Sequence, residues 1–238
     1  MQEVVNDLFD YPNLKIYQYI EGFKFSLDSI LLAEYVKVTN KTKTILDLCS
    51  GNAAVPMILS TKTKALIDAF EIQECIYKLA KKSIMLNKLD NQITIYNENI
   101  KNIEKFKKGI KYDIITCNPP YFKVDDDNHI NNTEVLAIAR HEIEISLEDI
   151  FDIASSYLND KGEFYMVHRV SRLDEIIILG NKYNLNVKNI ELIKTKNNSK
   201  PYIALVRCIK NSKLGIKINN EKYIGNLKTY QGMFKEDL

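Results

Sequence analysis

The 238-residue chain has no tryptophan, eight glycines, three histidines and four cysteines. The cysteines, Cys49, Cys75, Cys117 and Cys208, include no Cys-x-x-Cys pair, and three histidines are too few to complete a zinc site with them. We therefore expect no metal centre. The simplest account of the cysteines is four reduced thiols in a cytoplasmic protein.

Long apolar runs and an N-terminal leader are also missing. The first ten residues, MQEVVNDLFD, include acids and no apolar core, which excludes a signal peptide. No run approaches the roughly 18 apolar residues that a membrane-spanning helix needs. These absences predict a cytoplasmic protein without a membrane partner, and no obligate protein partner is evident.

A strongly basic composition is absent as well, since the net charge is only +2. This value neither favours nor excludes a nucleic-acid partner, because a basic face can coexist with acids elsewhere. Two stretches do lean basic, Lys101–Lys111 and Lys194–Lys200. Either can simply be a solvated surface.

The length and a hydrophobic content of 45% fit one α/β domain with a modest extension. We assign residues 1–40 to an N-terminal extension that packs on a main domain of residues 41–238. The extension holds a short β-like piece, Ile16–Ile20, and a helix that Ser26 or Asp28 caps and that runs to about Lys37.

From residue 44 onward, short apolar runs alternate with helix-length segments, which predicts a mostly parallel sheet covered by helices on both faces. The last two strands are joined by a polar loop without a helix, so we expect an antiparallel pair. The result is a Rossmann-like α/β fold with seven strands, the final one antiparallel. The predicted strands are Thr44–Cys49, Ala65–Phe70, Ile93–Tyr96, Tyr112–Cys117, Glu163–His168, Val187–Ile193 and Ile203–Ile209, and the predicted helices are Ala53–Ser60, Gln73–Asn87, Leu147–Leu158 and Arg172–Tyr183.

The first of these strands runs into Cys49-Ser50-Gly51-Asn52-Ala53, a small-residue loop before a helix. This arrangement is typical of nucleotide-binding sites in open α/β sheets. Such loops usually hold more glycine, and here Cys49 and Ala53 stand where further glycines are expected. A loop with few glycines suits S-adenosylmethionine better than NAD, because S-adenosylmethionine has no pyrophosphate to seat on the helix.

Two further strand ends add candidate cofactor ligands. Glu71 ends the second strand, 20 residues after Gly51, where an acid can bind ribose hydroxyls. After the third strand, either Glu98 or Asn99 is placed to contact a cofactor adenine.

The strongest local signal is Asn118-Pro119-Pro120-Tyr121, directly after the fourth predicted strand. Two acceptors, the Asn118 side-chain oxygen and the Pro119 carbonyl, can orient an amine whose lone pair is delocalised into a ring or a carbonyl. Tyr121 offers a face for stacking a flipped base. Neither a metal nor a covalent nucleophile is required, and we interpret the adjacent Cys117 as a core residue.

With these residues in place, the chain resembles class I methyltransferases and, more narrowly, bacterial tRNA adenine-N6 methyltransferases that modify the adenine 3′ of the valine-tRNA anticodon. The similar segments are FSLDSILLA from Phe25, ILDLCSGNAAVP from Ile45, NPPYF from Asn118 and ARHE ending at Glu142. The resemblance covers most of the chain. It implies S-adenosylmethionine as cofactor and tRNA as substrate.

The motifs and the resemblance together assign roles to residues, and the lysines near the last strands are added from their charge and position alone. The catalytic set is Asn118, Pro119, Pro120 and Tyr121. The expected cofactor-binding residues are Phe25, Ser26, Asp47, Cys49, Ser50, Gly51, Asn52, Glu71, Ile72, Asn99, Ile100 and Asn118. The expected substrate-binding residues are Tyr121, Phe122, Arg140, His141, Lys194, Lys196 and Lys200, with Tyr202 beside them.

Three alternatives stay open. The same turn can orient a glutamine side-chain amide, as in protein N5-glutamine methyltransferases, although those carry a larger N-terminal domain. Ribosomal RNA is the second alternative substrate. The third alternative is a degenerate member that binds RNA without catalysis, which the loss of glycine at Cys49 and Ala53 favours.

Overall fold

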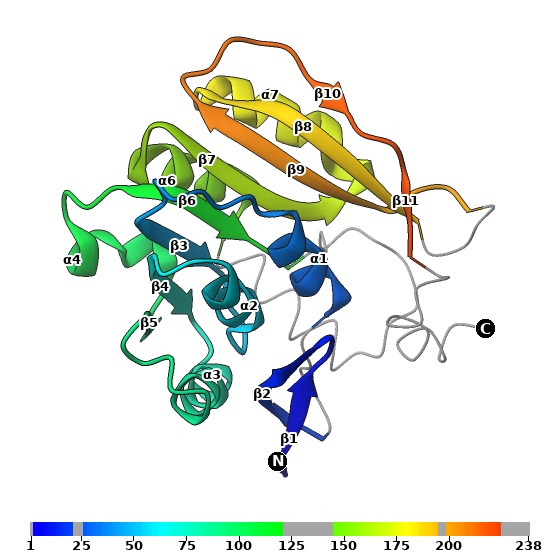
Figure 1. Cartoon of the computed structure of the whole chain (residues 1–238). Helices are drawn as coiled ribbons and strands as arrows, with labels where there is room; N and C mark the ends of the chain where they lie inside the picture. The colour runs from blue at the N-terminus through cyan, green and yellow to red at the C-terminus, as the bar shows by residue number, and fades with distance from the viewer. Residues whose placement is uncertain (1, 21–25, 121–144, 195–198, 225–238) are drawn as a thin grey trace.

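The computed structural model describes residues 2–20, 26–120, 145–194 and 199–224. An antiparallel hairpin of β1 and β2 precedes α1, and a large sheet with its helices follows (Figure 1). The strands are β1 (Glu3–Leu8), β2 (Tyr11–Tyr19), β3 (Thr44–Leu48), β4 (Leu66–Glu71), β5 (Ile93–Asn97), β6 (Tyr112–Cys117), β7 (Leu158–Arg169), β8 (Leu185–Lys194), β9 (Ile203–Lys210), β10 (Lys217–Ile218) and β11 (Lys222–Tyr223). The helices are α1 (Leu27–Tyr35), α2 (Ala54–Lys62), α3 (Glu74–Leu86), α4 (Glu104–Lys107), α6 (Leu147–Tyr157) and α7 (Leu173–Lys182), with 3-10 turns at Ile100–Asn102 and Val170–Arg172.

The large sheet has the strand order β10-β8-β9-β7-β6-β3-β4-β5, and β11 also pairs with β8. Strands β3 to β7 pair in parallel, whereas β9 is antiparallel to both β7 and β8. All seven predicted strands are present, and the predicted antiparallel pair is confirmed. The short β10 and β11 bring the large sheet to nine strands within the described residues. Strands of two residues are too short to leave an alternating pattern in a sequence.

Side-chain alternation along the strands builds two cores, one on each face of the sheet. Ile45 packs with residues of α1, α2 and α3, while its neighbour Leu46 packs with residues of α6 and α7. Figure 1 shows α1 and α2 on one side of the sheet and α6 and α7 on the other. The prediction of helices on both faces is therefore confirmed.

The predicted helices of the main domain lie within two residues of α2, α3, α6 and α7. The start of α6 is fixed by a capping box, in which the Ser146 hydroxyl accepts from the Asp149 amide and the Asp149 carboxylate accepts from Ser146. The short α4 escaped prediction because four residues carry no helical period. No helix in the described ranges is long and apolar enough to cross a bilayer.

The N-terminal extension differs most from expectation. The predicted piece Ile16–Ile20 corresponds to the last part of the longer β2, which ends one residue earlier at Tyr19. Its partner β1 was not predicted because most of the β1 side chains are exposed or half-buried. The hairpin attaches to α3, since the Tyr17 amide donates to Ser83 Oγ at 2.9 Å and the Lys15 amide donates to Asn87 Oδ1 at 2.8 Å. Ser26 is the N-cap residue of α1, which ends at Tyr35 rather than Lys37. The division of the chain at residue 40 stays a proposal.

Candidate active site

The loop between β3 and α2 has an unusual backbone. Cys49, Gly51 and Ala53 all have positive φ, at 57°, 56° and 66°. This is the conformation that glycine adopts without strain and that costs other residues roughly 1–2 kcal/mol. The backbone therefore favours glycine at Cys49 and Ala53, the two positions where the sequence analysis expects it.

Glu71 clamps this loop from the end of the neighbouring strand β4. Its Oε2 accepts from the Gly51 amide at 2.9 Å, and its Oε1 accepts from the Gln73 amide at 2.7 Å. Burial raises the pKa of Glu71, and these hydrogen bonds act in the opposite direction. Each oxygen keeps a second lone pair, so the carboxylate can shape the loop and still accept from a ribose hydroxyl.

Asp47 and Asn52 leave two polar atoms buried without a partner among the described residues, Asp47 Oδ2 and Asn52 Nδ2. The two side chains are 1% and 2% exposed. The other Asp47 oxygen accepts from Thr116 Oγ1 at 2.5 Å, and burial raises the pKa of Asp47 to about 7. Unsatisfied buried groups are rare in native proteins. An acceptor and a donor of this kind fit the ammonium and carboxylate ends of a bound amino acid such as the methionine part of S-adenosylmethionine.

The residues after β5 are engaged locally. Asn99 Oδ1 accepts from the Lys101 amide at 3.0 Å, and Glu98 Oε1 accepts from the Asn99 amide at 2.8 Å and from Asn102 Nδ2 at 2.9 Å. The contacts do not distinguish Glu98 from Asn99 as the adenine ligand. Of the neighbouring candidates, Ile72 is exposed and Ile100 is buried.

Asn118 and the two prolines follow β6, beside the loop after β3, because the parallel pairing of β3 and β6 places Leu48 opposite Cys117. Asn118 Nδ2 donates to Ser29 Oγ at 2.9 Å and to Ser26 Oγ at 3.4 Å, so its amide nitrogen faces the start of α1. Pro119 is buried and Pro120 is half-buried. Cys117 is fully buried, and burial raises the pKa of its thiol, which confirms its interpretation as a core residue.

Further charged and aromatic groups lie at the same edge, because β8 runs parallel to β7 with the antiparallel β9 between them. Arg169 at the end of β7 lies over the Tyr202 ring, 5.9 Å from its centroid. Lys194 at the end of β8 pairs with Glu221 at 2.8 Å, and Lys200 is exposed. Six predicted site residues lie outside the described residues: Phe25, Tyr121, Phe122, Arg140, His141 and Lys196.

Prediction from sequence missed three residues that this geometry brings into the site. Ser29 and Thr116 hold Asn118 and Asp47, and Arg169 joins Tyr202. Ser29 lies within the FSLDSILLA segment, which was the available signal. For Thr116 and Arg169 no local pattern distinguishes them from other strand residues.

The family model for the methyltransferase small domain matches residues 24–197. The chain belongs to this family. The matched residues include α1, the loop after β3 and the Asn118 turn. Membership together with the class I fold makes the chain an S-adenosylmethionine-dependent methyltransferase.

Curated relatives share much of the length at low identity. A tRNA1(Val) (adenine(37)-N6)-methyltransferase of Cytophaga hutchinsonii is 24% identical over 186 residues, 78% of this chain and 76% of that protein. The protein of the same name from Pedobacter heparinus is 25% identical over 206 residues, 86% of this chain and 85% of its own.

Solved structures share the fold. A predicted O-methyltransferase from Agrobacterium tumefaciens superimposes with a TM-score of 0.64 and 19% identity over 84% of this chain and 90% of its own. The 16S rRNA N2 G1207 methyltransferase of T. thermophilus, in complex with AdoMet and guanosine, gives a TM-score of 0.63 and 15% identity over 88% of this chain and 51% of its own. At these identities the likeness establishes the class I methyltransferase fold and nothing about the substrate.

Proposed function

We propose that the chain methylates the exocyclic N6 amine of an adenine in tRNA, the adenine 3′ of the anticodon of a valine tRNA. The observation that carries this proposal is the Asn118-Pro119-Pro120 turn after β6, with the Asn118 amide hydrogen-bonded to Ser29. The names of the Cytophaga and Pedobacter relatives support the choice of tRNA and of the N6 position.

The Asn118 turn is suited to an amine that is a poor nucleophile. The lone pair of the adenine amine is delocalised into the ring, so the amine is a poor nucleophile. In our proposal the Asn118 side-chain oxygen and the Pro119 carbonyl accept from its two N–H groups, which aims the lone pair out of the ring plane and stabilises the positive charge that develops on nitrogen. The methylated nitrogen then releases a proton to water, so the chain needs no general base.

The cofactor half of the site uses the loop after β3 and the ends of β4 and β5. S-adenosylmethionine supplies an electrophilic methyl group when bound. Asp47 and Asn52 offer their unpartnered buried atoms to its amino-acid end, and Glu71 accepts from ribose hydroxyls. The other proposed cofactor residues are Phe25, Ser26, Cys49, Ser50, Gly51, Ile72, Asn99, Ile100 and Asn118.

The RNA lies, in this proposal, across the edge where β6, β7 and β8 end. Arg169, Lys194 and Lys200 supply positive charge for phosphates, and Tyr202 supplies a stacking surface. Tyr121, Phe122, Arg140, His141 and Lys196 are proposed to join them. The flipped adenine stacks on Tyr121.

Methyl transfer from labelled S-adenosylmethionine tests the proposal. The acceptors are an unmodified valine-tRNA transcript, ribosomal RNA and a release-factor protein, and digestion identifies the product. We expect N6-methyladenosine at one position of the tRNA. Label in ribosomal RNA or on a glutamine of the protein contradicts tRNA as substrate and selects one of those alternatives.

A further inference from the structure

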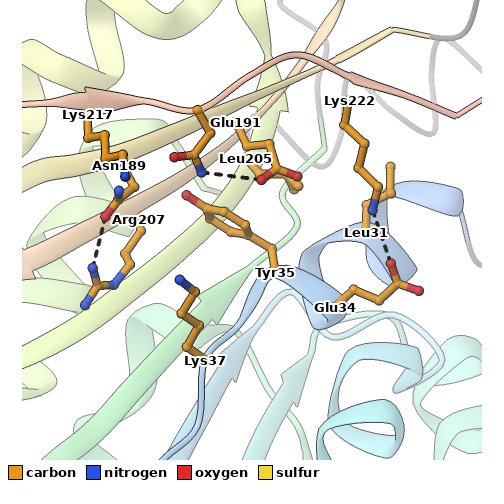
Figure 2. Close-up of a pocket in the computed structure, with 11 residues that line it drawn as sticks. Leu31, Glu34, Tyr35, Lys37, Asn189, Glu191, Leu205, Arg207, Lys217 and Lys222 are labelled. Carbon is orange, nitrogen blue, oxygen red and sulfur yellow. Dashed lines mark hydrogen bonds and ion pairs between the residues drawn. The ribbon is translucent and has the colours of Figure 1, made fainter.

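A cavity of about 380 Å³ lies beside the last turn of α1, against strands β8 and β9 (Figure 2). Leu31, Glu34 and Tyr35 of α1 line one side of it, and Asn189, Glu191 and Arg207 of the strands line another. Its volume is that of a small-ligand pocket. It does not include the loop after β3 or Asn118, so it is separate from the proposed methyl-transfer site.

The lining carries four cations, Lys37, Arg207, Lys217 and Lys222, against the two carboxylates of Glu34 and Glu191. Arg207 is already engaged, because it forms a bidentate pair with Glu163 at 2.5 and 2.7 Å. Lys222 pairs with Glu34 at 3.5 Å.

The remaining two cations, Lys37 and Lys217, form no ion pair within the part of the chain that the structure describes. They come from opposite sides of the cavity, Lys37 from the segment after α1 and Lys217 from β10. Figure 2 shows the Lys37 ammonium directed toward the strand side, where Arg207 lies. An anionic group between them would be attracted to both.

Tyr35, Glu191 and two asparagines complete the polar part of the lining. The Tyr35 hydroxyl is buried and has no partner among the described residues. Burial raises the pKa of Tyr35, so this hydroxyl stays a donor at neutral pH. Asn219 Nδ2 donates to Glu191 Oε2 at a long 3.4 Å. Glu191 and the two asparagines thus offer both donors and acceptors beside Tyr35, which is what the edge of a nucleobase requires.

Helix α1 connects the cavity to the proposed catalytic turn. Ser29 at one end of the helix contacts Asn118, and Tyr35 at the other end lines the cavity. Six residues separate them, which is about 9 Å along the helix axis. A nucleotide close to the reacting adenine in an unpaired loop can span this separation.

We propose that this cavity binds one nucleotide of the RNA substrate, with its phosphate between Lys37 and Lys217 and its base against Tyr35 and Glu191. This inference rests on the proposed function for the identity of the RNA. It adds a second recognition point, which would distinguish the correct RNA loop from other exposed adenines.

The test measures direct binding of an unmodified valine-tRNA transcript over a range of salt concentrations. The double variant Lys37→Ala/Lys217→Ala should bind about tenfold more weakly, with a log K against log salt slope shallower by about one. The matched control is Lys41→Ala/Lys64→Ala, which removes the same charge from exposed positions just before β3 and β4 that do not line the cavity. The control should bind within about twofold of the wild type.

Equal weakening in both double variants, or unchanged binding in the first, overturns the cavity proposal. A titration with AMP tests whether the cavity binds a free nucleotide instead of a nucleotide of the RNA. If the Lys37→Ala/Lys217→Ala variant loses affinity for AMP but keeps full tRNA affinity, the cavity takes a free nucleotide and the proposal is wrong. Methyl transfer by the wild type is scored separately, so a failure of the proposed function is told apart from a failure of this inference.

Discussion

Asn118 Nδ2 lies 2.9 Å from Ser29 Oγ, and this hydrogen bond joins the turn after β6 to the first turn of α1 across 89 positions of the chain. An amide group is planar, so fixing its nitrogen also fixes the direction of its oxygen. The hydrogen bond therefore orients the Asn118 side-chain oxygen as an acceptor. Ser29 is accordingly a positioning residue for the proposed reaction.

Replacing Asn118 by alanine should lower kcat by at least about a hundredfold, because one acceptor for the developing charge is lost. Binding of S-adenosylmethionine, measured by calorimetry, should persist, because the other proposed cofactor residues, Asp47, Asn52 and Glu71 among them, are unchanged. Near-wild-type turnover would remove Asn118 from the proposed mechanism.

Ser29→Ala should lower kcat by about tenfold through misorientation of Asn118, the scale of one lost hydrogen bond. The KM values for both substrates should change little, and Ser29→Thr, which keeps the hydroxyl, should recover most of the rate. Ser156→Ala, an exposed serine of α6, is the control. A Ser29→Ala enzyme that is as fast as the control, or a loss of rate that threonine does not rescue, would contradict the positioning role.

The backbone at Ala53 predicts an asymmetric response to mutation. Ala53→Gly relieves the positive φ but loses a buried methyl group and adds unfolded-state entropy, so the free energy of unfolding should stay within about 1 kcal/mol of the wild type. Ala53→Val should lower it by roughly 2 kcal/mol or more, since a β-branched residue is strained at this φ. Urea unfolding measures both, and equal stabilities for valine and glycine would show that the loop adopts another conformation.

Asp47 predicts a pH dependence of stability. Its pKa of about 7 in the folded protein exceeds the ordinary value of 3.8 because the side chain is buried. Between these values the folded state binds more protons than the unfolded state, so the Asp47 contribution to stability should fall as pH rises from about 4 to 7 and level off above that. Glu71, whose pKa burial also raises, contributes in the same direction.

The variant Asp47→Asn distinguishes the contribution of Asp47 to the pH dependence of stability from that of Glu71. The variant should lose less stability than the wild type between about pH 4 and pH 7, as measured by denaturant unfolding at fixed ionic strength. If the free energy of unfolding changes with pH in the same way in both proteins, the ionisation of Asp47 does not affect stability and the prediction is wrong.

The sequence predicted the elements whose signal is local. Alternation and length located the seven main strands, and the 3–4 spacing located α3 between Gln73 and Asn87. The turn at Asn118 was visible because proline and asparagine are rare in that combination at a strand end. The strand β1 was missed because most of its side chains are exposed or half-buried. The two-residue β10 and β11 were missed because they are too short to carry a pattern and pair with the distant β8.

The candidate site was predictable in its residue types but not in its contacts. Glu71 was expected to face a ribose, and the structure adds that both of its oxygens hold backbone amides. Ser29 and Thr116 could not be recognised, since a serine in a helix and a threonine in a strand are common and their partners are 89 and 69 positions away.

The reversed direction of β9 has an evolutionary consequence. Because β9 runs against its neighbours, β8 ends at Lys194 and β9 begins at Ile203 on the same edge of the sheet as the Asn118 turn. The loop after β3 and Glu71 belong to the other half of that edge. Under the proposed function, substitutions at Lys194, Lys200 and Tyr202 would therefore alter which molecule is methylated while the methyl-donor half is inherited unchanged. A family built on this topology can diversify its substrates by changing one half of a shared edge.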